Sequence, residues 1–247
     1  MARDPGVALY AADTTVLQNA DGPARLCIGS IGQSLPPVCG IVPVPNWSWN
    51  YVEGELSLAG TTWGEYHVVG AYDGQSFVLV EAPGPRRPRA TPEPSPLGSA
   101  CAIPSGGWTG PDPGLSSPVA QNAAVVLAHQ SDDLAGVWID HGPPGGPVLN
   151  IAYTGDLPRH EAELRAVWGG PLCLSTQPRA LHDLRAYQRE ITDGAIPGLR
   201  WLGVGVDEAR SQLMVHAVLI DDRIQEALDG RFGPGVVRAT SALNLVG

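Results

Sequence analysis

Gly136-Val137-Trp138-Ile139-Asp140 is the stretch that decides the fold, because it returns later in the chain as Gly203-Val204-Gly205-Val206-Asp207. After both copies, a second apolar stretch, an aspartate, an amphipathic segment and an aromatic-glycine pair follow in the same order. A pattern that recurs over this distance is typical of one supersecondary unit used twice. We therefore expect residues 119–247 to form one domain built from two similar units.

The residues after each copy predict the order of elements in a unit. Apolar runs indicate two strands, the aspartate is suited to cap a helix, and the aromatic-glycine pair ends that helix before a third strand. Each unit reads strand, strand, helix, strand, so we expect an α+β fold with helices packed on an antiparallel sheet. Further helices are expected at residues 120–134 and after residue 178. The matched positions are Asp156 with Asp221, Leu164 with Leu228, Trp168-Gly169 with Phe232-Gly233, and Leu172 with Val236.

The N-terminal part has a different character. Residues 1–81 predict a small all-β module, whose clearest feature is a hairpin formed by residues 66–72 and 75–80. The intervening Asp73-Gly74 favours a type I′ turn. Residues 82–118 are rich in proline, which is typical of a semi-extended linker that cannot build a core.

Composition excludes several classes of protein. The chain has 247 residues, 43% apolar residues and a net charge of -10. Its basic residues are all arginines without a dense cluster outside residues 86–89, so nucleic-acid binding is not expected. No apolar run is long enough for a transmembrane helix, and the first residues lack the apolar region of a signal peptide. We expect no membrane span and no leader in this chain.

The four cysteines indicate an oxidising environment. Cys27, Cys39, Cys101 and Cys173 contain no CxxC pair, so a metal knuckle is not expected. Two disulfides, Cys27–Cys39 and Cys101–Cys173, are the favoured interpretation, although other pairings and buried free thiols are alternatives. Disulfides imply an exported protein of the extracellular space or cell envelope. We expect no cofactor and no metal.

Three tryptophans of the N-terminal module are candidate binding residues. Trp47, Trp49 and Trp63 lie close together in the sequence. Aromatic side chains can form a platform that stacks on sugar rings, and they can equally form the core of a small β module. The platform would require exposed, coplanar rings and would make this a cell-wall glycan or small-ligand binding module.

Candidate catalytic residues are sparse. His129 and Asp133 are four residues apart on one expected helix face, beside Asp132, and Asp140-His141 are adjacent. These groups are the basis of a hydrolase hypothesis; the alternative is a solvated helix end. No G-x-S-x-G motif for a serine nucleophile is present. Cys173, near a turn after Gly169-Gly170-Pro171, is a candidate nucleophile for which disulfide bonding is the favoured interpretation. Asp140 and Asp207 occupy equivalent positions and are expected to start turns by accepting bonds from backbone N–H groups.

The repeated hairpins carry a resemblance. Residues 136–140 with 148–154, and residues 203–207 with 213–217, resemble the prodomains of secreted bacterial serine proteases of the alpha-lytic and streptogrisin type. The stretches 61–67, 72–74 and 231–238 resemble segments of uncharacterised exported actinobacterial proteins. The prodomain resemblance covers about residues 119–247. No protease domain follows in this chain, so the resemblance carries over no catalytic residue.

The resemblance and the composition lead to one expectation about function. We expect a non-catalytic exported protein whose prodomain-like C-terminal domain binds another exported protein, through a sheet edge or the repeat surface. Glycan binding by the tryptophans and an unassigned hydrolase activity are the alternatives.

Overall fold

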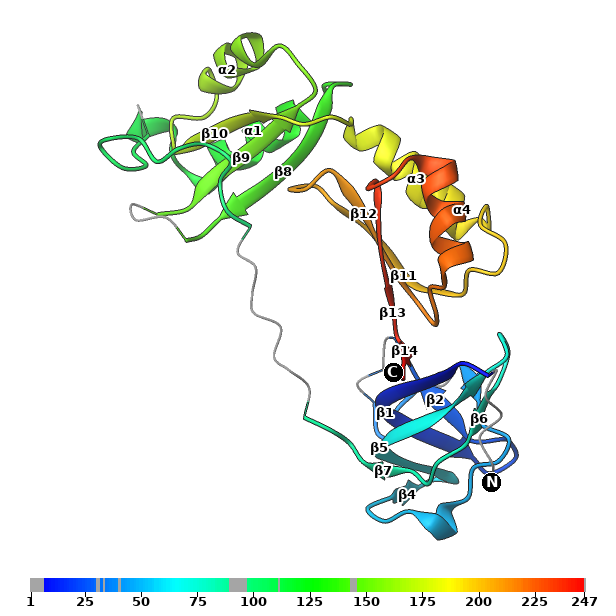
Figure 1. The fold of residues 1–247 in the computed structure, drawn as a ribbon. Coiled ribbons are helices and arrows are strands. Elements are labelled where there is room, and N and C mark those ends of the chain that lie inside the picture. The colour runs from blue at the N-terminus through cyan, green and yellow to red at the C-terminus, as the bar shows by residue number, and fades with distance from the viewer. Residues whose placement is uncertain are drawn as a thin grey trace.

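A computed structural model describes residues 7–29, 32, 34–39, 41–88, 97–110, 112–142 and 146–246. Within them the fold is mixed α+β, as expected, with four α-helices and strands that form three sheets (Figure 1). No helix of this described part has the length and apolar character needed to cross a bilayer. The predicted linker segment 89–96 and the first six residues lie outside the described residues.

The first sheet contains the N-terminal strands and the end of the chain. Its strand order is β3-β2-β1-β5-β4, with β6 and β7 also on β5 and β14 also on β1. The central pair β1–β5 is antiparallel from Leu9↔Ala71 to Asn19↔Thr61. The elements are β1 (Leu9–Asn19), β2 (Arg25–Cys27), β3 (Val42–Pro43), η1 (Trp49–Tyr51), β4 (Leu56–Leu58), β5 (Thr61–Tyr72), β6 (Phe77–Leu79), β7 (Gly84–Pro85) and β14 (Asn244–Leu245).

The predicted hairpin forms, but its turn differs from the type I′ prediction. Tyr72 pairs with Phe77, which leaves a four-residue loop in place of a two-residue turn. Within that loop the Asp73 carboxylate accepts bonds from the backbone N–H groups of Gln75 and Ser76. Because an aspartate can satisfy the loop's own amides in this way, the chain closes a longer connection than the Asp-Gly signal indicates.

The other two sheets are built alike. In the sheet β10-β9-β8, β8 and β9 are antiparallel, whereas β9 and β10 are parallel. In the sheet β11-β12-β13, β11 and β12 are antiparallel, whereas β12 and β13 are parallel. The elements are η2 (Pro113–Leu115), α1 (Pro118–Ala128), β8 (Leu134–Asp140), β9 (Val148–Tyr153), α2 (Leu157–Arg165), β10 (Leu172–Thr176), α3 (Leu181–Thr192), β11 (Trp201–Asp207), β12 (Gln212–Ala217), α4 (Asp222–Phe232) and β13 (Val237–Ser241).

The expectation of antiparallel sheets was therefore wrong in one strand of each sheet. A helix lies between the second and third strand, α2 before β10 and α4 before β13. A helical crossover returns the chain to the same end of the sheet, so the third strand must run parallel to the second. The first expected helix is also shorter than 120–134, because α1 ends at Ala128 and Leu134 already begins β8.

Each of these sheets has its own core beneath its helices. In the first, Ala124 of α1 and Leu164 of α2 pack against Leu149 and Ile151 of β9. In the second, α3 and α4 lie over one face, and their leucines pack on β12 (Figure 1). The buried residues of that second core include Leu184, Leu228, Leu213 and Val215.

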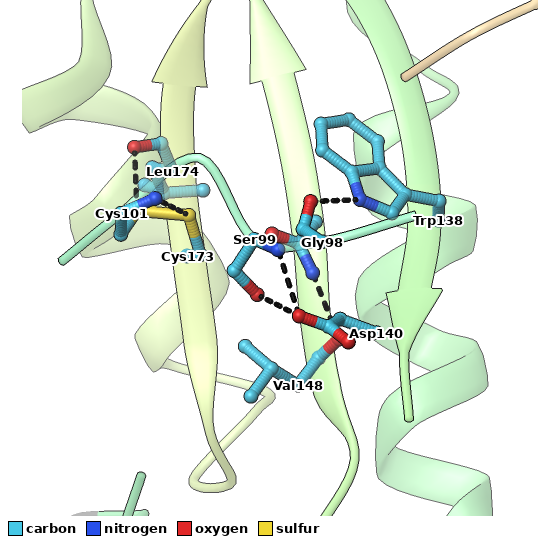
Figure 2. The surroundings of a disulfide bond; sticks show 9 residues. Gly98, Ser99, Cys101, Trp138, Asp140, Val148, Cys173 and Leu174 are labelled. Carbon is cyan, nitrogen blue, oxygen red and sulfur yellow. Dashed lines mark hydrogen bonds between the residues drawn. A yellow bond between two sulfur atoms is a disulfide. The ribbon is translucent and has the colours of Figure 1, made fainter. Parts of the chain in front are cut away.

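Part of the predicted linker packs as a strap, residues 97–108, on the sheet β10-β9-β8 (Figure 2). The Cys101–Cys173 disulfide joins the strap to β10, and Trp108, only 5% exposed, packs with Val148 and Cys173. Ser99 donates its N–H and its hydroxyl to the carboxylate of Asp140. The second predicted disulfide, Cys27–Cys39, is also present.

The last part of the chain connects the second helical sheet to the N-terminal module. Val218 and Leu243 are fully buried in the core of the N-terminal module. The Arg200 guanidinium donates to the Tyr72 hydroxyl at 2.9 Å and to the carbonyl of Ile41 at 3.2 Å. The N-terminal module is thus packed against the strands that follow α3.

Candidate functional site

The outer strands of the two helix-covered sheets offer four edges, and three of them are covered. An edge strand exposes unpaired backbone groups that another strand can join, so proteins usually block such edges. On β8 the N–H of Val137 donates to the Glu208 carboxylate at 2.9 Å. On β11 the carbonyl of Val204 accepts from the Gln188 amide at 2.9 Å. At β10 the strap is disulfide-bonded to Cys173, and Cys101 Sγ lies 3.4 Å from the carbonyl oxygen of Leu174.

The fourth edge, that of β13, pairs with no other strand in the described part of the chain. Two backbone bonds fix which groups face outward: Leu213 donates to Val236, and Ala242 donates to Ala217. Residues of a strand alternate in the direction of their backbone groups, so even-numbered residues of β13 face β12. The outward N–H and C=O groups then belong to Val237, Ala239 and Ser241, of which Val237 is buried and the other two are half-buried.

The sheet face next to this edge is also open. On β12, Leu213 and Val215 point into the helix-covered core, so Met214 and His216 lie on the opposite face. A Cβ added to Gly203 or Gly205 of β11 would meet no atom within 4 Å. The face opposite the helices is therefore smooth and uncovered at these positions.

A polar cleft of about 380 Å³ lies where β13 reaches the N-terminal module. Asp13 accepts a bond from the backbone N–H of Arg87 at 2.8 Å, and its carboxylate lies 3.1 Å from Nδ1 of His67. Arg86 forms an ion pair with Glu65 at 2.6 Å. The charged groups of the cleft thus already have partners. The polar residues that line it are Asp13, Thr14, Thr15, Arg86, His216, Ser241 and Asn244.

The three candidate tryptophans do not form one platform. Trp47 and Trp49 are half-buried and packed edge to face, with ring planes 75° apart. Both pack against the core of the N-terminal module, and the indole N–H of Trp49 donates to Gln18. Trp63 is 8% exposed and belongs to a separate cluster with Leu17 and Cys27. Neither the exposure nor the coplanarity that sugar stacking requires is met.

The structure leaves the hydrolase candidates in two places: His129 and Asp132 line one hollow at the end of α1, whereas Asp140 ends β8 and His141 follows it. Asp133 is paired with His160, and 2.8 Å separate Oδ2 of Asp133 from Nε2 of His160. The sequence did not indicate His160 as a partner of Asp133. The Ser131 hydroxyl also donates to Asp133 and not to the imidazole, so it is not the base-activated hydroxyl that nucleophilic catalysis needs. His160 is 2% exposed and its ring stacks on Tyr153 at 3.6 Å. The sequence feature that could have indicated a buried His160 is its position four residues before Leu164, on the same helix face.

The carboxylates in this region are held in their ionised form by hydrogen bonds. Burial raises the pKa of Asp133, but bonds from Ser131 and His160 outweigh burial and the pKa is lowered overall. Burial likewise raises the pKa of Asp140, but the hydrogen bonds from Gly142 and Ser99 outweigh burial, so this pKa is also lowered overall. Burial, together with the nearby Asp133 charge, raises the pKa of Tyr153 to about 12. At neutral pH these two carboxylates are therefore ionised and the Tyr153 phenol is neutral.

The two equivalent turn aspartates behave as expected. Asp140 accepts from the N–H of Gly142 at 2.9 Å, and Asp207 accepts from the N–H of Arg210 at 3.1 Å. His141 is exposed beside its turn. Two aspartates were expected to cap helices, and only one of them does. Asp221 accepts a bond from the N–H of Ile224 at the start of α4, whereas Asp156 makes no such bond at the start of α2. Asp156 has a left-handed backbone, with φ 48°, and its carboxylate pairs instead with the Arg159 guanidinium at 3.2 Å.

No group of three or more histidine, cysteine, aspartate or glutamate side chains in the described residues could hold a metal ion. The chain matches no protein-family model and no curated protein. The edge and the open face of the sheet β11-β12-β13 are therefore the features of this structure that bear on function.

Proposed function

We propose that this chain is a non-catalytic exported protein that acts through protein–protein interaction, by accepting an extended segment of another exported protein along β13. The observation that carries the proposal is the edge of β13, where no described residue bonds to the outward backbone groups, beside three edges that a side chain or the strap contacts. Strand addition at such an edge gains backbone hydrogen bonds along the whole segment. The smooth face beside the edge leaves room for the side chains of the added segment.

The internal repeat supports a prodomain-like C-terminal domain. We infer that the two β-β-α-β segments are copies of one unit, because their matched residues occupy corresponding places. Leu164 and Leu228 are both buried in the cores under the helices. Asp156 and Asp221 both immediately precede a helix. The resemblance to prodomains of alpha-lytic and streptogrisin-type proteases then suggests a secreted serine protease as the partner, and two disulfides are compatible with export.

The alternatives have less support. A glycan-binding module would need the tryptophan platform that Trp47, Trp49 and Trp63 do not form. A hydrolase would need a nucleophile beside a base, and Asp133 holds both Ser131 and His160.

The proposal can be tested with a mature secreted protease of the streptogrisin type. We expect the chain to inhibit the protease in a titration of residual activity, and we expect Ala239→Pro to weaken inhibition at least tenfold. Proline removes one outward N–H of β13 and leaves the bonds to β12 intact. Ala239→Ser is the matched control, because serine keeps the N–H.

Two results would contradict parts of the proposal. Inhibition by the wild-type chain that is equally strong in the proline variant would move the contact away from β13. No inhibition at micromolar protein would remove this class of protease as the partner.

A further inference from the structure

We propose that the end of α1 and one face of α3 form a binding site for a tetrahedral oxyanion, a phosphate or sulfate group. The site is a hollow of about 200 Å³ on the first helix-covered unit. Leu134 and Leu181 form its buried floor. The residues around them are polar or charged: His129, Ser131, Asp132, His182, Arg185 and Arg189.

The helix α3 supplies the positive charge. His182, Arg185 and Arg189 lie at positions i, i+3 and i+7, which places them on one face of the helix. In the described part of the chain, the only charged partner of Arg185 is Glu208, at 3.7 Å, and the Arg189 guanidinium has none. Two guanidinium groups one turn apart, one without a partner and one loosely held, present several free N–H donors to the same hollow.

The opposite wall is suited to the same ligand. The side chain of His129, at the end of α1, has no partner among the described residues. On α3, both ring nitrogens of His182 are already engaged, Nδ1 at 3.0 Å from the carbonyl oxygen of Asp132 and Nε2 at 3.1 Å from Asp183, so the donors left for an anion are those of His129 and the two arginines. Among the described residues Asp132 is the carboxylate that lines the hollow, while Asp183 and Glu208 lie against His182 and Arg185.

This grouping of basic side chains is unusual for the chain. The net charge is -10 and there are only 15 arginines in all, yet two of them meet beside His129 at one small hollow. Guanidinium groups bind phosphate and sulfate through paired N–H donors. Because donors approach from both α1 and α3, a ligand with oxygens on several sides satisfies more of them than a flat carboxylate. We therefore assign the site to a tetrahedral anion.

The test is calorimetric titration of the full chain with sodium sulfate and sodium phosphate in a low-chloride buffer. We expect saturable binding with one site, and we expect Arg189→Gln to weaken it about tenfold, the loss of one charge-assisted pair. Arg231→Gln is the matched control: Arg231 is an exposed arginine paired with Glu190, outside the hollow. This control should bind as the wild-type chain does.

Further arms separate the possible sources of the anion. Tighter binding of phenyl phosphate than of inorganic phosphate would assign the site to a phosphate ester, whereas the reverse would assign it to a free anion. Binding of acetate as tight as sulfate would overturn the assignment to a tetrahedral group. No saturable binding of either anion at about 10 mM, or equal weakening in both variants, would overturn the site itself. The site is independent of β13, so Ala239→Pro should leave anion binding unchanged.

Discussion

Glu208 lies directly against Gly136, so closely that a Cβ added to Gly136 would sit 2.5 Å from the Glu208 carbonyl oxygen. Glu208 belongs to the turn between β11 and β12, and Gly136 to β8 of the preceding sheet. The Glu208 carboxylate also accepts the N–H of Val137. The turn between β11 and β12 is therefore packed on the strand β8, and Gly136 is the residue that permits the contact.

Gly136→Ala should destabilise the chain by about 1–3 kcal/mol, because the added methyl group meets backbone that cannot move aside easily. The matched control is Gly203→Ala at the equivalent position of the second unit. A Cβ there meets nothing within 4 Å, so this variant should unfold close to the wild-type denaturant concentration. Urea unfolding followed by circular dichroism measures both. An equal effect of the two substitutions would contradict the proposed contact.

Reduction of the Cys101–Cys173 link should release the strap. The disulfide closes a segment of 72 residues, so its loss in Cys101→Ser/Cys173→Ser should cost about 4 kcal/mol of unfolding free energy. Limited proteolysis should then cut within residues 97–110, where the wild-type chain resists. The Cys27→Ser/Cys39→Ser variant serves as the control, because it leaves the strap tied and should give no new cuts there. A strap that stays protected without its disulfide would show that Trp108 and Ser99 suffice to hold it.

Asp133→Asn should change how stability depends on pH. The pKa of Asp133 is lowered below 3.8 in the folded chain, so the folded state binds fewer protons at this carboxylate than the unfolded chain. Its contribution is therefore full above the unfolded pKa and is lost as the pH falls through the folded pKa. We expect the variant to lose about 1–2 kcal/mol near pH 6 and the difference from wild type to shrink towards pH 3. Urea midpoints measured from pH 6 to pH 3 test this, and a constant difference across that range would exclude the linkage.

Arg200→Gln should loosen the N-terminal module from the second helix-covered sheet. It removes bonds to the Tyr72 hydroxyl and to the carbonyls of Gly74 and Ile41. We expect a loss of about 2 kcal/mol, since several charge-assisted bonds go at once. Tyr72→Phe removes only the hydroxyl and should cost less than half as much. Hydrogen exchange should rise in residues 72–79 of the arginine variant, and unchanged exchange there would contradict the bridging role.

The sequence alone was sufficient where the signal is local. The repeated pattern of residues 136–140 and 203–207 predicted two strand pairs of the right type, because alternation and turn aspartates act over a few residues. The cysteine pattern predicted both disulfides, since an even number of cysteines without metal spacing leaves pairing as the favoured outcome. The parallel pairing of β9 with β10 and of β12 with β13 does not follow from a local pattern, because it depends on the helix that lies between the two paired strands.

The tertiary structure decided which features are available for function. Trp63 and Trp47 look equivalent in the sequence, yet the fold places them in different clusters. His160 and Asp133 are 27 residues apart and meet only because α2 packs beside the start of β8. In the described part of the chain no strand pairs with the outer edge of β13, while Glu208, Gln188 and the strap contact the other three edges. A sequence pattern determines which residues favour a strand; whether a strand's outer edge is covered depends on segments far along the chain, which only the folded packing brings together.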